Sequence, residues 1–355
     1  MKYEACGVPA AEAQPEVVRL WNARAARSND VVFRWGYLSN PSGPGQCFLL
    51  RATDGGTSSI VGTVGIGTRR VSLGGRTLVA GVLGDFFVVK GHRTFFPALS
   101  MQRAVLGWAR QNLDLVYGFP NELARPIIKR LGFREMAHFQ RHVLVLRHAS
   151  YLADRIGSNT GARLLAVPID QLRRLVYPGI SRRPAAGLRF GRIERIDERF
   201  DRLFHARAFQ GLTVGHRDAK LLQWRFIDYP GDPCSIYGLT DGAGELRAYV
   251  VVQMTREIAH VRDLLGVDVE AMGEALRLMG GVARSHRCVS LSFACAAPPQ
   301  LQRVLDRLGF RTRNSAEGPR VLFGHAGDAL LAEGANGRNL SALDRWYATE
   351  VDEDQ

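Results

Sequence analysis

Two stretches of this chain, FRWGYLSNP at 33–41 and LQWRFIDYP at 222–230, repeat one pattern. In each stretch a Trp (Trp35 and Trp224) stands six residues before a Pro, and an aromatic residue follows the Trp by two positions. A short apolar run comes after each stretch. An internal repeat takes precedence over single motifs, because each copy is expected to form the same structural unit.

Two further matches occur in the same order along the chain. LARPIIKRLGFRE at 123–135 corresponds to QLQRVLDRLGFRT at 300–312, and both contain Arg-Leu-Gly-Phe-Arg. An acidic residue opens an apolar run in each copy, Asp85 in DFFVV and Asp263 in DLLGV. From this residue to the Phe of Leu-Gly-Phe the spacing is 48 residues in the first copy and 47 in the second. Three matches in order predict a tandem duplication.

Length and composition place the chain among globular proteins. Its 355 residues suggest two or three domains, and 46% hydrophobic with 23% charged residues excludes wholesale disorder. No apolar run reaches the ~18 residues that a membrane-spanning helix needs. The N-terminus lacks the apolar stretch of a secretory signal. Five scattered cysteines without a Cys-x-x-Cys pair fit a reducing compartment and argue against a zinc site. We therefore expect a cytoplasmic protein without a metal.

The chain is strongly basic, with a formal net charge of +13. Such a surface suits nucleic acid, an anionic membrane face or an anionic small molecule. The positive residues are almost all arginines, and they are spread along the chain apart from a modest cluster between Arg173 and Arg183. We therefore expect no nucleic-acid partner, and we keep tRNA as the minor alternative.

The apolar pattern predicts that each copy is an α+β unit, with a mixed, mostly antiparallel sheet flanked by helices. In the first copy we expect helices over 15–27, 33–38, 97–110 and 122–130. The expected strands are 47–51, 60–69, 71–73, 77–79, 82–89, 113–117 and 139–146. The second copy repeats this order from a strand at 189–196 to a helix at 299–308. The predicted domains are 1–149 and 188–327, with a linker at 150–187 and a tail at 328–355.

This order of elements resembles the fold of the GNAT acetyltransferases. VVKGHRTFFPALSMQRAV at 88–105 looks like the acyl-CoA loop of that family, whose pattern is Arg/Gln-x-x-Gly-x-Gly/Ala at a strand-to-helix turn. Arg93 takes the first position and Ala98 the last, while Phe96 stands where the family has glycine. FPNELARPIIKRLGF at 119–133 looks like the Asn and the helix that follow the fifth strand in that family. The resemblance implies two tandem GNAT-like domains.

The resemblance also implies an acyl-CoA site on the first copy, with acetyl-CoA as the expected cofactor. A helix N-terminus carries free backbone N–H groups and about half a positive charge, which suits a pyrophosphate. We expect Thr94 to cap the helix that begins near Pro97. The residues expected to bind the cofactor are Phe87, Val88, His92, Arg93, Thr94, Phe95, Phe96, Ala98 and Asn121. In the second copy, Asp268 and Glu270 stand at the corresponding helix start and would repel phosphates, so we expect that copy to have lost cofactor binding.

Acyl transfer to an amine needs a base for the ammonium proton and an acid for the departing thiolate. Many members of the family use as acid a Tyr four residues before the Gly of Leu-Gly-Phe, but Ile128 and Leu305 stand there in this chain. We identify Asp85 as the candidate base and Tyr117, at the end of the next strand, as a candidate acid. His138 and His142 share a strand face without a partner carboxylate nearby in sequence. We expect Trp35 and Trp224 to anchor the core.

The leading hypothesis is an acyl-CoA-dependent N-acetyltransferase, or a transferase of a longer acyl group, acting on a small amine such as an amino sugar or an amino acid. The alternatives are an inactive GNAT pair that serves as a binding module and an aminoacyl-tRNA-dependent transferase of the related double-domain fold. The acidic C-terminal tail could dock onto the basic protein or remain a frayed terminus. The sequence leaves the oligomeric state open.

Overall fold

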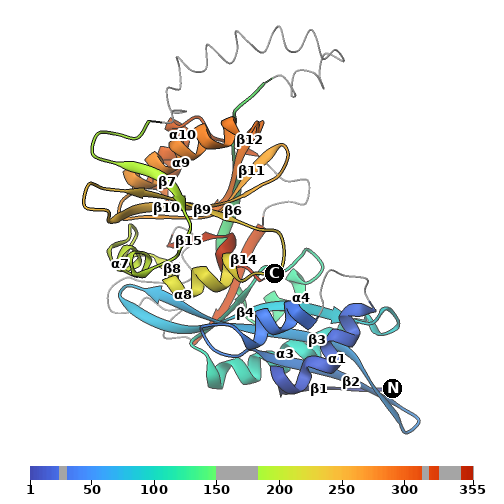
Figure 1. Ribbon diagram of the computed structural model, residues 1–355. Helices are drawn as coiled ribbons and strands as arrows, with labels where there is room; N and C mark the ends of the chain where they lie inside the picture. Colours follow the sequence, from blue (N-terminus) through green and yellow to red (C-terminus); the bar gives the residue numbers. More distant parts are fainter. Residues whose placement is uncertain (24–29, 149–182, 314–319, 328–344, 355) are drawn as a thin grey trace, which may run out of the picture.

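The computed structural model describes residues 1–23, 30–148, 183–313, 320–327 and 345–354. Two sheets with flanking helices are stacked one above the other in Figure 1, the sheet of the first copy below and that of the second copy above. This arrangement confirms the predicted tandem α+β fold. Most of the expected linker at 150–187 and the first part of the expected tail lie outside the described residues.

The lower sheet has the strand order β1-β2-β3-β4-β5-β14-β6. Its neighbouring strands are antiparallel, except that β4 and β5 are parallel. The bounds are Lys2–Pro9 for β1, Gln46–Asp54 for β2, Thr57–Leu73 for β3, Arg76–Val88 for β4, Leu115–Gly118 for β5, Arg320–Ala326 for β14 and Arg134–Val145 for β6.

The upper sheet has the strand order β7-β9-β10-β11-β12-β6-β13. Here too one pair is parallel, β11 with β12, and the other pairs are antiparallel. The bounds are Arg189–Ile193 for β7, Ser235–Thr240 for β9, Leu246–Met254 for β10, Ile258–Gly266 for β11, Ser290–Ala296 for β12 and Arg311–Arg313 for β13.

The two copies exchange their last strands. Residues 134–139 of β6 pair with β14 in the lower sheet, and residues 140–145 of the same strand pair with β12 in the upper sheet. In return β14, from the second copy, lies between β5 and β6 of the first. Figure 1 shows β6 and β14 running between the two sheets. The copies are therefore separate in sequence but interlocked in space.

Helices cover both faces of each sheet. Along β2, Cys47 and Leu49 pack under α1, while Phe48 and Leu50 pack under α3, because alternate residues of a strand face opposite sides. The helices of the first copy are α1 (Ala10–Asn22), α2 (Asp30–Phe33), η1 (Arg34–Leu38), η2 (Lys90–His92), α3 (Phe95–Asn112) and α4 (Arg125–Arg130). Those of the second are α7 (Glu198–Ala206), α8 (Ala219–Leu222), η3 (Gln223–Ile227), α9 (Val269–Ser285) and α10 (Pro299–Arg307).

The C-terminal segment joins the two sheets. Its strand β15 (Trp346–Thr349) is antiparallel to β12 and parallel to β8 (Thr213–Gly215), and β8 in turn pairs with β3. The short helix η4 (Glu350–Asp352) follows β15. The tail therefore docks onto the protein through residues 346–354 and is not a frayed end there.

Several expected elements differ in extent from the observed ones. Strands expected at 60–69 and 71–73 form the single strand β3, and those at 77–79 and 82–89 form β4, because the two make one long hairpin. The sequence prediction missed β1, an edge strand with alternating burial. The helix expected to begin near Pro97 begins at Phe95. Within the described ranges, no helix has the length and apolar character that a membrane crossing requires.

Candidate functional site

A pocket of about 250 Å³ lies where the first copy, the second copy and the C-terminal segment meet. The pocket opens on the face of the lower sheet that α1 covers, and α3 covers the opposite face. Val82 and Gly84 of β4 line the pocket, whereas Val88 of the same strand packs against α3. The lining residues from all three parts are Trp21, Val32, Trp35, Gly36, Tyr37, Gly67, Arg69, Val82, Gly84, Asp85, Trp224, Tyr229 and Asp354.

Asp85 reaches this pocket from a bulge in β4. The β3–β4 register shifts between Thr63 and Gly65, and Asp85 adopts a φ of 54°, a left-handed conformation that is uncommon for residues other than glycine. The Tyr37 hydroxyl donates a hydrogen bond of 2.6 Å to its carboxylate. Gly65 gives Tyr37 its room, because a Cβ there would lie 1.9 Å from the Tyr37 oxygen. Burial and the nearby Asp85 raise the pKa of Tyr37, so this hydroxyl keeps its proton.

A second carboxylate, Asp354, enters the same pocket from the C-terminal segment. A Cβ on Gly84 would lie 2.7 Å from its Oδ2 atom, so the side chain rests directly on β4 beside the bulge. Burial, and after it the charge of Asp85, raise the pKa of Asp354 to about 7. Two carboxyl groups that face one pocket, one of them titrating near neutral pH, are suited to taking up a proton.

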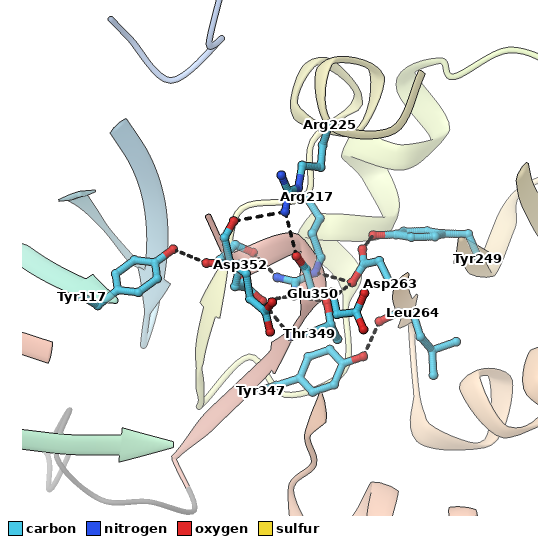
Figure 2. Close-up of polar contacts among 12 residues, drawn as sticks. Tyr117, Arg217, Arg225, Tyr249, Asp263, Leu264, Tyr347, Thr349, Glu350 and Asp352 are labelled. Carbon is cyan, nitrogen blue, oxygen red and sulfur yellow. Dashed lines mark hydrogen bonds and ion pairs between the residues drawn. The ribbon is translucent and has the colours of Figure 1, made fainter. Parts of the chain in front are cut away.

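A buried polar network holds the C-terminal segment in this position (Figure 2). The Arg217 guanidinium, fully buried, donates to Asp352 at 2.6 Å and to Asp263 at 3.1 Å. Thr349 donates to Asp263 at 2.7 Å, and Arg225 donates to the backbone carbonyls of Glu350 and Glu353. These contacts fix the backbone just before Asp354.

The repeated Trp residues meet each other at the wall of the pocket. The rings of Trp35 and Trp224 stack with 4.5 Å between centroids and 9° between planes. Each indole N–H donates a hydrogen bond of 2.8 Å to the backbone carbonyl of the other Trp. Both side chains are buried, at 6% and 4% exposure, as expected of core anchors. They also line the pocket, so the repeat itself builds part of the site.

Arg69 of β3 adds a positive charge to the wall. Its side chain is 6% exposed, and its guanidinium carbon lies 4.9 Å from the centre of the Trp224 ring. Its Nη1 donates to the carbonyl of Thr68, and its Nε has no hydrogen-bond partner among the described residues. Burial lowers the pKa of Arg69.

The expected cofactor residues gather on the other side of the sheet, around the start of α3. β4 and β5 pair from Ala80 with Leu115 to Leu83 with Gly118, and beyond those residues no described strand pairs with β4 on that side. We call this point the strand fork. Since the two strands are parallel, the start of α3 and the chain that follows β5 lie at the same edge of the sheet.

The individual side chains at this edge differ in exposure and partners. Phe87, Val88 and Ala98 are buried, whereas Phe95 and Phe96 are exposed by 42% and 76%. Arg93 donates from Nε to the carbonyl of Val88, and its guanidinium carbon lies 5.5 Å from the Phe87 ring centre. His92 shares a hydrogen bond with the Tyr3 hydroxyl. Thr94 occupies the N-cap position of α3 but makes no side-chain capping bond, which corrects that expectation.

Two residues expected at the site make hydrogen bonds to the protein backbone. Asn121 is exposed, and its Oδ1 accepts a hydrogen bond from the backbone N–H of Ala124 at the turn before α4. Tyr117 is 2% exposed and donates to the backbone carbonyl of Asp352 at 2.9 Å, and burial raises its pKa (Figure 2). Tyr117 does not line the pocket, so this geometry favours a role in holding the C-terminal segment.

The structure corrects the expectation that His138 and His142 have no partner carboxylate nearby in sequence, since Glu135 stands three residues before His138. His138 contacts Glu135 at the exposed lower part of β6, whereas His142 is 1% exposed and lies in the part of β6 that pairs with β12. Burial lowers the pKa of His142. Within the described residues there is no group of three or more His, Cys, Asp or Glu that could hold a metal.

The second copy has the same fork, but its own chain fills it. β11 and β12 pair only from Ile258 to Val261, and β15 then lies beside the end of β12. The Tyr347 hydroxyl donates to the carbonyl of Leu264. Asp268 caps α9 by accepting from the N–H of Ala271 at 2.7 Å. Asp263, the counterpart of Asp85, is fully buried in the Arg217 network.

Three important pocket residues escaped the sequence prediction. Asp354 stands in an acidic run at the end of the chain, and only the preceding apolar WYAT at 346–349 gave a signal that this end could dock. Arg69 follows the largely apolar run at 60–66 of β3, but Arg70 stands beside it, so the sequence does not distinguish the buried cation from its more exposed neighbour. Tyr37 was noted only as part of the repeat.

The fold of this chain is similar to several solved structures. A conserved protein of Enterococcus faecalis V583, described as a probable N-acyltransferase, matches with a TM-score of 0.67 and 11% identity, over 93% of this chain and 74% of that chain. A GCN5-related N-acetyltransferase from Anabaena variabilis matches with 0.65 and 10%, over 93% and 75%. A tandem GNAT protein from the clavulanic acid biosynthesis pathway matches with 0.52 and 15%, over 92% and 98%.

No protein-family model matches the chain, and no curated protein matches it. At 10–15% identity, the likeness to these structures is one of fold. It agrees with the strand order and the duplication described above.

Proposed function

We propose that this chain, which has the tandem GNAT fold, is an acyl-CoA-dependent N-acyltransferase that acts on the amine of a small molecule. The observation that carries the proposal is the pocket with Asp85 and Asp354, which lies across the sheet from an open helix start in the first copy. We further propose acetyl-CoA as the donor and the first copy as the half that binds it.

The residues at the α3 N-terminus fit the phosphates of such a donor. The N-cap side chain of α3 leaves the first backbone N–H groups of the helix uncapped, and those groups favour an anion. Lys90 and Arg93 are exposed just before the helix and add positive charge. Phe96, where the family has glycine, differs from the pattern; its exposed ring would keep phosphates from the closest approach there.

The strand fork supports a route from this edge to the pocket. The bound donor would supply an acyl thioester carbon as the electrophile. A pantetheine arm is an extended chain with amide groups, and the backbone of β4 beyond Leu83 has no strand partner on the fork side among the described residues. Gly84 and Asp85 follow Leu83 directly, so the fork and the pocket adjoin.

We propose that Asp85 and Asp354 together take the proton from the acceptor ammonium. A neutral amine is needed to attack the thioester carbon, and a carboxylate in the pocket is the proposed base. As the C–N bond forms, the C–S bond breaks, and the departing thiolate takes up the proton that the amine nitrogen loses. Tyr37 holds the Asp85 carboxylate in place through its hydrogen bond. The raised pKa of Asp354, about 7, makes it a better proton acceptor than an ordinary carboxylate.

Calorimetry with acetyl-CoA, free CoA and tRNA tests this proposal, followed by an assay of thiol release with a panel of small amines. We expect acetyl-CoA and CoA to bind, tRNA not to bind, and thiol release to require an amine. If neither acetyl-CoA nor CoA binds, the proposal is wrong. Binding without thiol release for any amine would instead favour the binding-module alternative, which the Phe96 departure suggests.

Phe96→Gly provides a control for the donor site. Restoring the glycine of the family pattern should keep or improve the affinity for CoA, because the backbone of the turn becomes accessible. A loss of CoA affinity in this variant would contradict the placement of the donor at the start of α3.

A further inference from the structure

The pocket contains a buried cation that forms no ion pair within the described part of the chain. The Arg69 side chain is only 6% exposed, yet it forms no ion pair with any carboxylate of the described residues. Among the described residues, its one hydrogen bond goes to the carbonyl of Thr68. A guanidinium that is removed from water and left without a counter-ion costs free energy, so its retention points to a ligand that supplies the negative charge.

The two carboxyl groups in the same pocket favour a positively charged group on the ligand. Asp85 and Asp354 lie on β4 and on the C-terminal segment, whereas Arg69 lies on β3. All three side chains line the same pocket, so their charges share one enclosure. A ligand with both an ammonium group and a carboxylate matches this pair of charges.

Aromatic side chains form much of the remaining wall. Trp21, Trp35, Trp224 and Tyr229 line the pocket, and Tyr229 packs edge-on against Trp35 with 4.9 Å between ring centroids. Such walls suit an apolar or aromatic group on the ligand. The volume of about 250 Å³ admits only a small molecule.

From these three observations we propose that the acyl acceptor is a free α-amino acid. Arg69 binds its carboxylate with charge-assisted hydrogen bonds, Asp85 and Asp354 face its ammonium group, and the Trp35–Trp224 wall contacts its side chain. The inference rests on the proposed acyl transfer and names its acceptor. It disfavours an amino sugar, which has the amine but no carboxylate for Arg69.

Ligand binding can be measured without any donor, through the intrinsic fluorescence of the Trp residues that line the pocket. The probes are the standard α-amino acids at concentrations up to millimolar. For each one that binds, the further probes are its decarboxylated amine and its carboxamide, with glucosamine as the amino sugar. We expect at least one amino acid to bind about 10- to 100-fold more tightly than its amine, the range typical of a hydrogen-bonded charge pair.

Variants at Arg69 show whether that side chain is responsible. Arg69→Met should raise the dissociation constant of the amino acid about 10- to 100-fold and leave that of the amine unchanged, since the amine never used Arg69. It should also unfold at the same or a higher temperature than the parent, because an unpaired buried charge is removed. Arg69→Lys should keep part of the preference.

Arg70→Gln is the matched control, since Arg70 is the next residue on the same strand and pairs with Asp218 outside the pocket. It should change neither dissociation constant.

The outcomes separate this inference from the proposed function. If no amino acid changes the fluorescence, if amine and amino acid bind equally, if glucosamine binds better, or if Arg69→Met weakens both ligands alike, the inference is wrong even where acyl transfer occurs. If the amino acid binds with the expected Arg69 dependence but no thiol is released, the ligand assignment stands and the proposed transfer is wrong.

Discussion

Replacing Asp354 with Asn removes one carboxylate from the pocket and keeps the shape that rests against Gly84. In the parent, burial and the charge of Asp85 raise the pKa of Asp354 from 3.8 to about 7. The folded state therefore holds this proton more tightly than the unfolded chain. Between pH ~4 and ~7 the stability of the parent falls as pH rises, because the carboxyl must ionise in a poorly hydrated place.

The size of the effect follows from the shift. About three pKa units correspond to ~4 kcal/mol at ~1.36 kcal/mol per unit, which is an upper bound. Asp354 is only partly buried, so water in the pocket reduces the expected difference to about 1–2 kcal/mol. Asp354→Asn should exceed the parent in unfolding free energy by this amount above pH ~7 and match it near pH ~4.

The same substitution removes half of the proposed proton acceptor. We expect kcat/KM for the amine to fall at least about tenfold above pH ~7, and the fall in rate of the parent below pH ~7 to be lost or displaced. Urea unfolding followed by circular dichroism, together with thiol release over a range of pH, measures both effects on the full chain.

Glu353→Gln is the control for activity. Burial also raises the pKa of Glu353 to about 7, but its carboxylate pairs with Arg320 and does not line the pocket. Its pH–rate profile should match that of the parent. A stability gain for Asp354→Asn that is the same at all pH values, or an unchanged pH–rate profile, would refute the assignment of Asp354 as a titrating pocket group.

Three other sets of substitutions test the donor site, the contact between the copies and the buried network. Arg93→Glu should weaken CoA binding about tenfold or more, as measured by calorimetry, because charge reversal beside a helix N-terminus costs at least ~1.4 kcal/mol. Asp268→Ala should leave the affinity for CoA unchanged, and equal affinities of the two variants would contradict the donor site. Trp35→Phe should lower the unfolding free energy by about 1–3 kcal/mol, because the indole N–H no longer donates to the backbone carbonyl of Trp224. A double-mutant cycle of Trp35→Ala with Trp224→Ala should give a coupling of about 0.5–1.5 kcal/mol, and a coupling near zero would mean that the stacked rings do not stabilise each other. Arg217→Met should cost about 3–5 kcal/mol, because it leaves Asp263 and Asp352 buried without their cation; a variant as stable as the parent would show that the network is not a stabilising unit.

The sequence allowed the fold to be predicted because the information is local and repeated. Trp35 and Trp224 mark the same helical turn, and each Leu-Gly-Phe marks the end of a helix. The left-handed glycines Gly132 and Gly309, both with a φ of 86°, show that the two turns are built alike. Such features depend on neighbouring residues, so they can be recognised without the tertiary structure.

The site could be predicted only in part, because it depends on contacts between distant segments. Asp85 was identified from its place on the central strand, and it does line the pocket. Asp263 has the same place in the second copy, yet Arg217 and Thr349 enclose it completely. No local pattern distinguishes the two, because the difference comes from where the C-terminal segment lies. The same segment supplies Asp354.

The exchange of last strands bears on how such a chain can arise and come apart. Each half would expose unpaired strand edges on its own, since residues 140–145 belong to the upper sheet and residues 320–326 to the lower one. A single ancestral unit with this geometry would complete its sheet only by trading strands with a second molecule. The duplicated chain thus has the strand pairing that a strand-swapped homodimer would have, with the two copies joined in one chain. Cutting the backbone between the copies should leave the halves associated, whereas expressing either half alone should restore the dimer or yield an insoluble product.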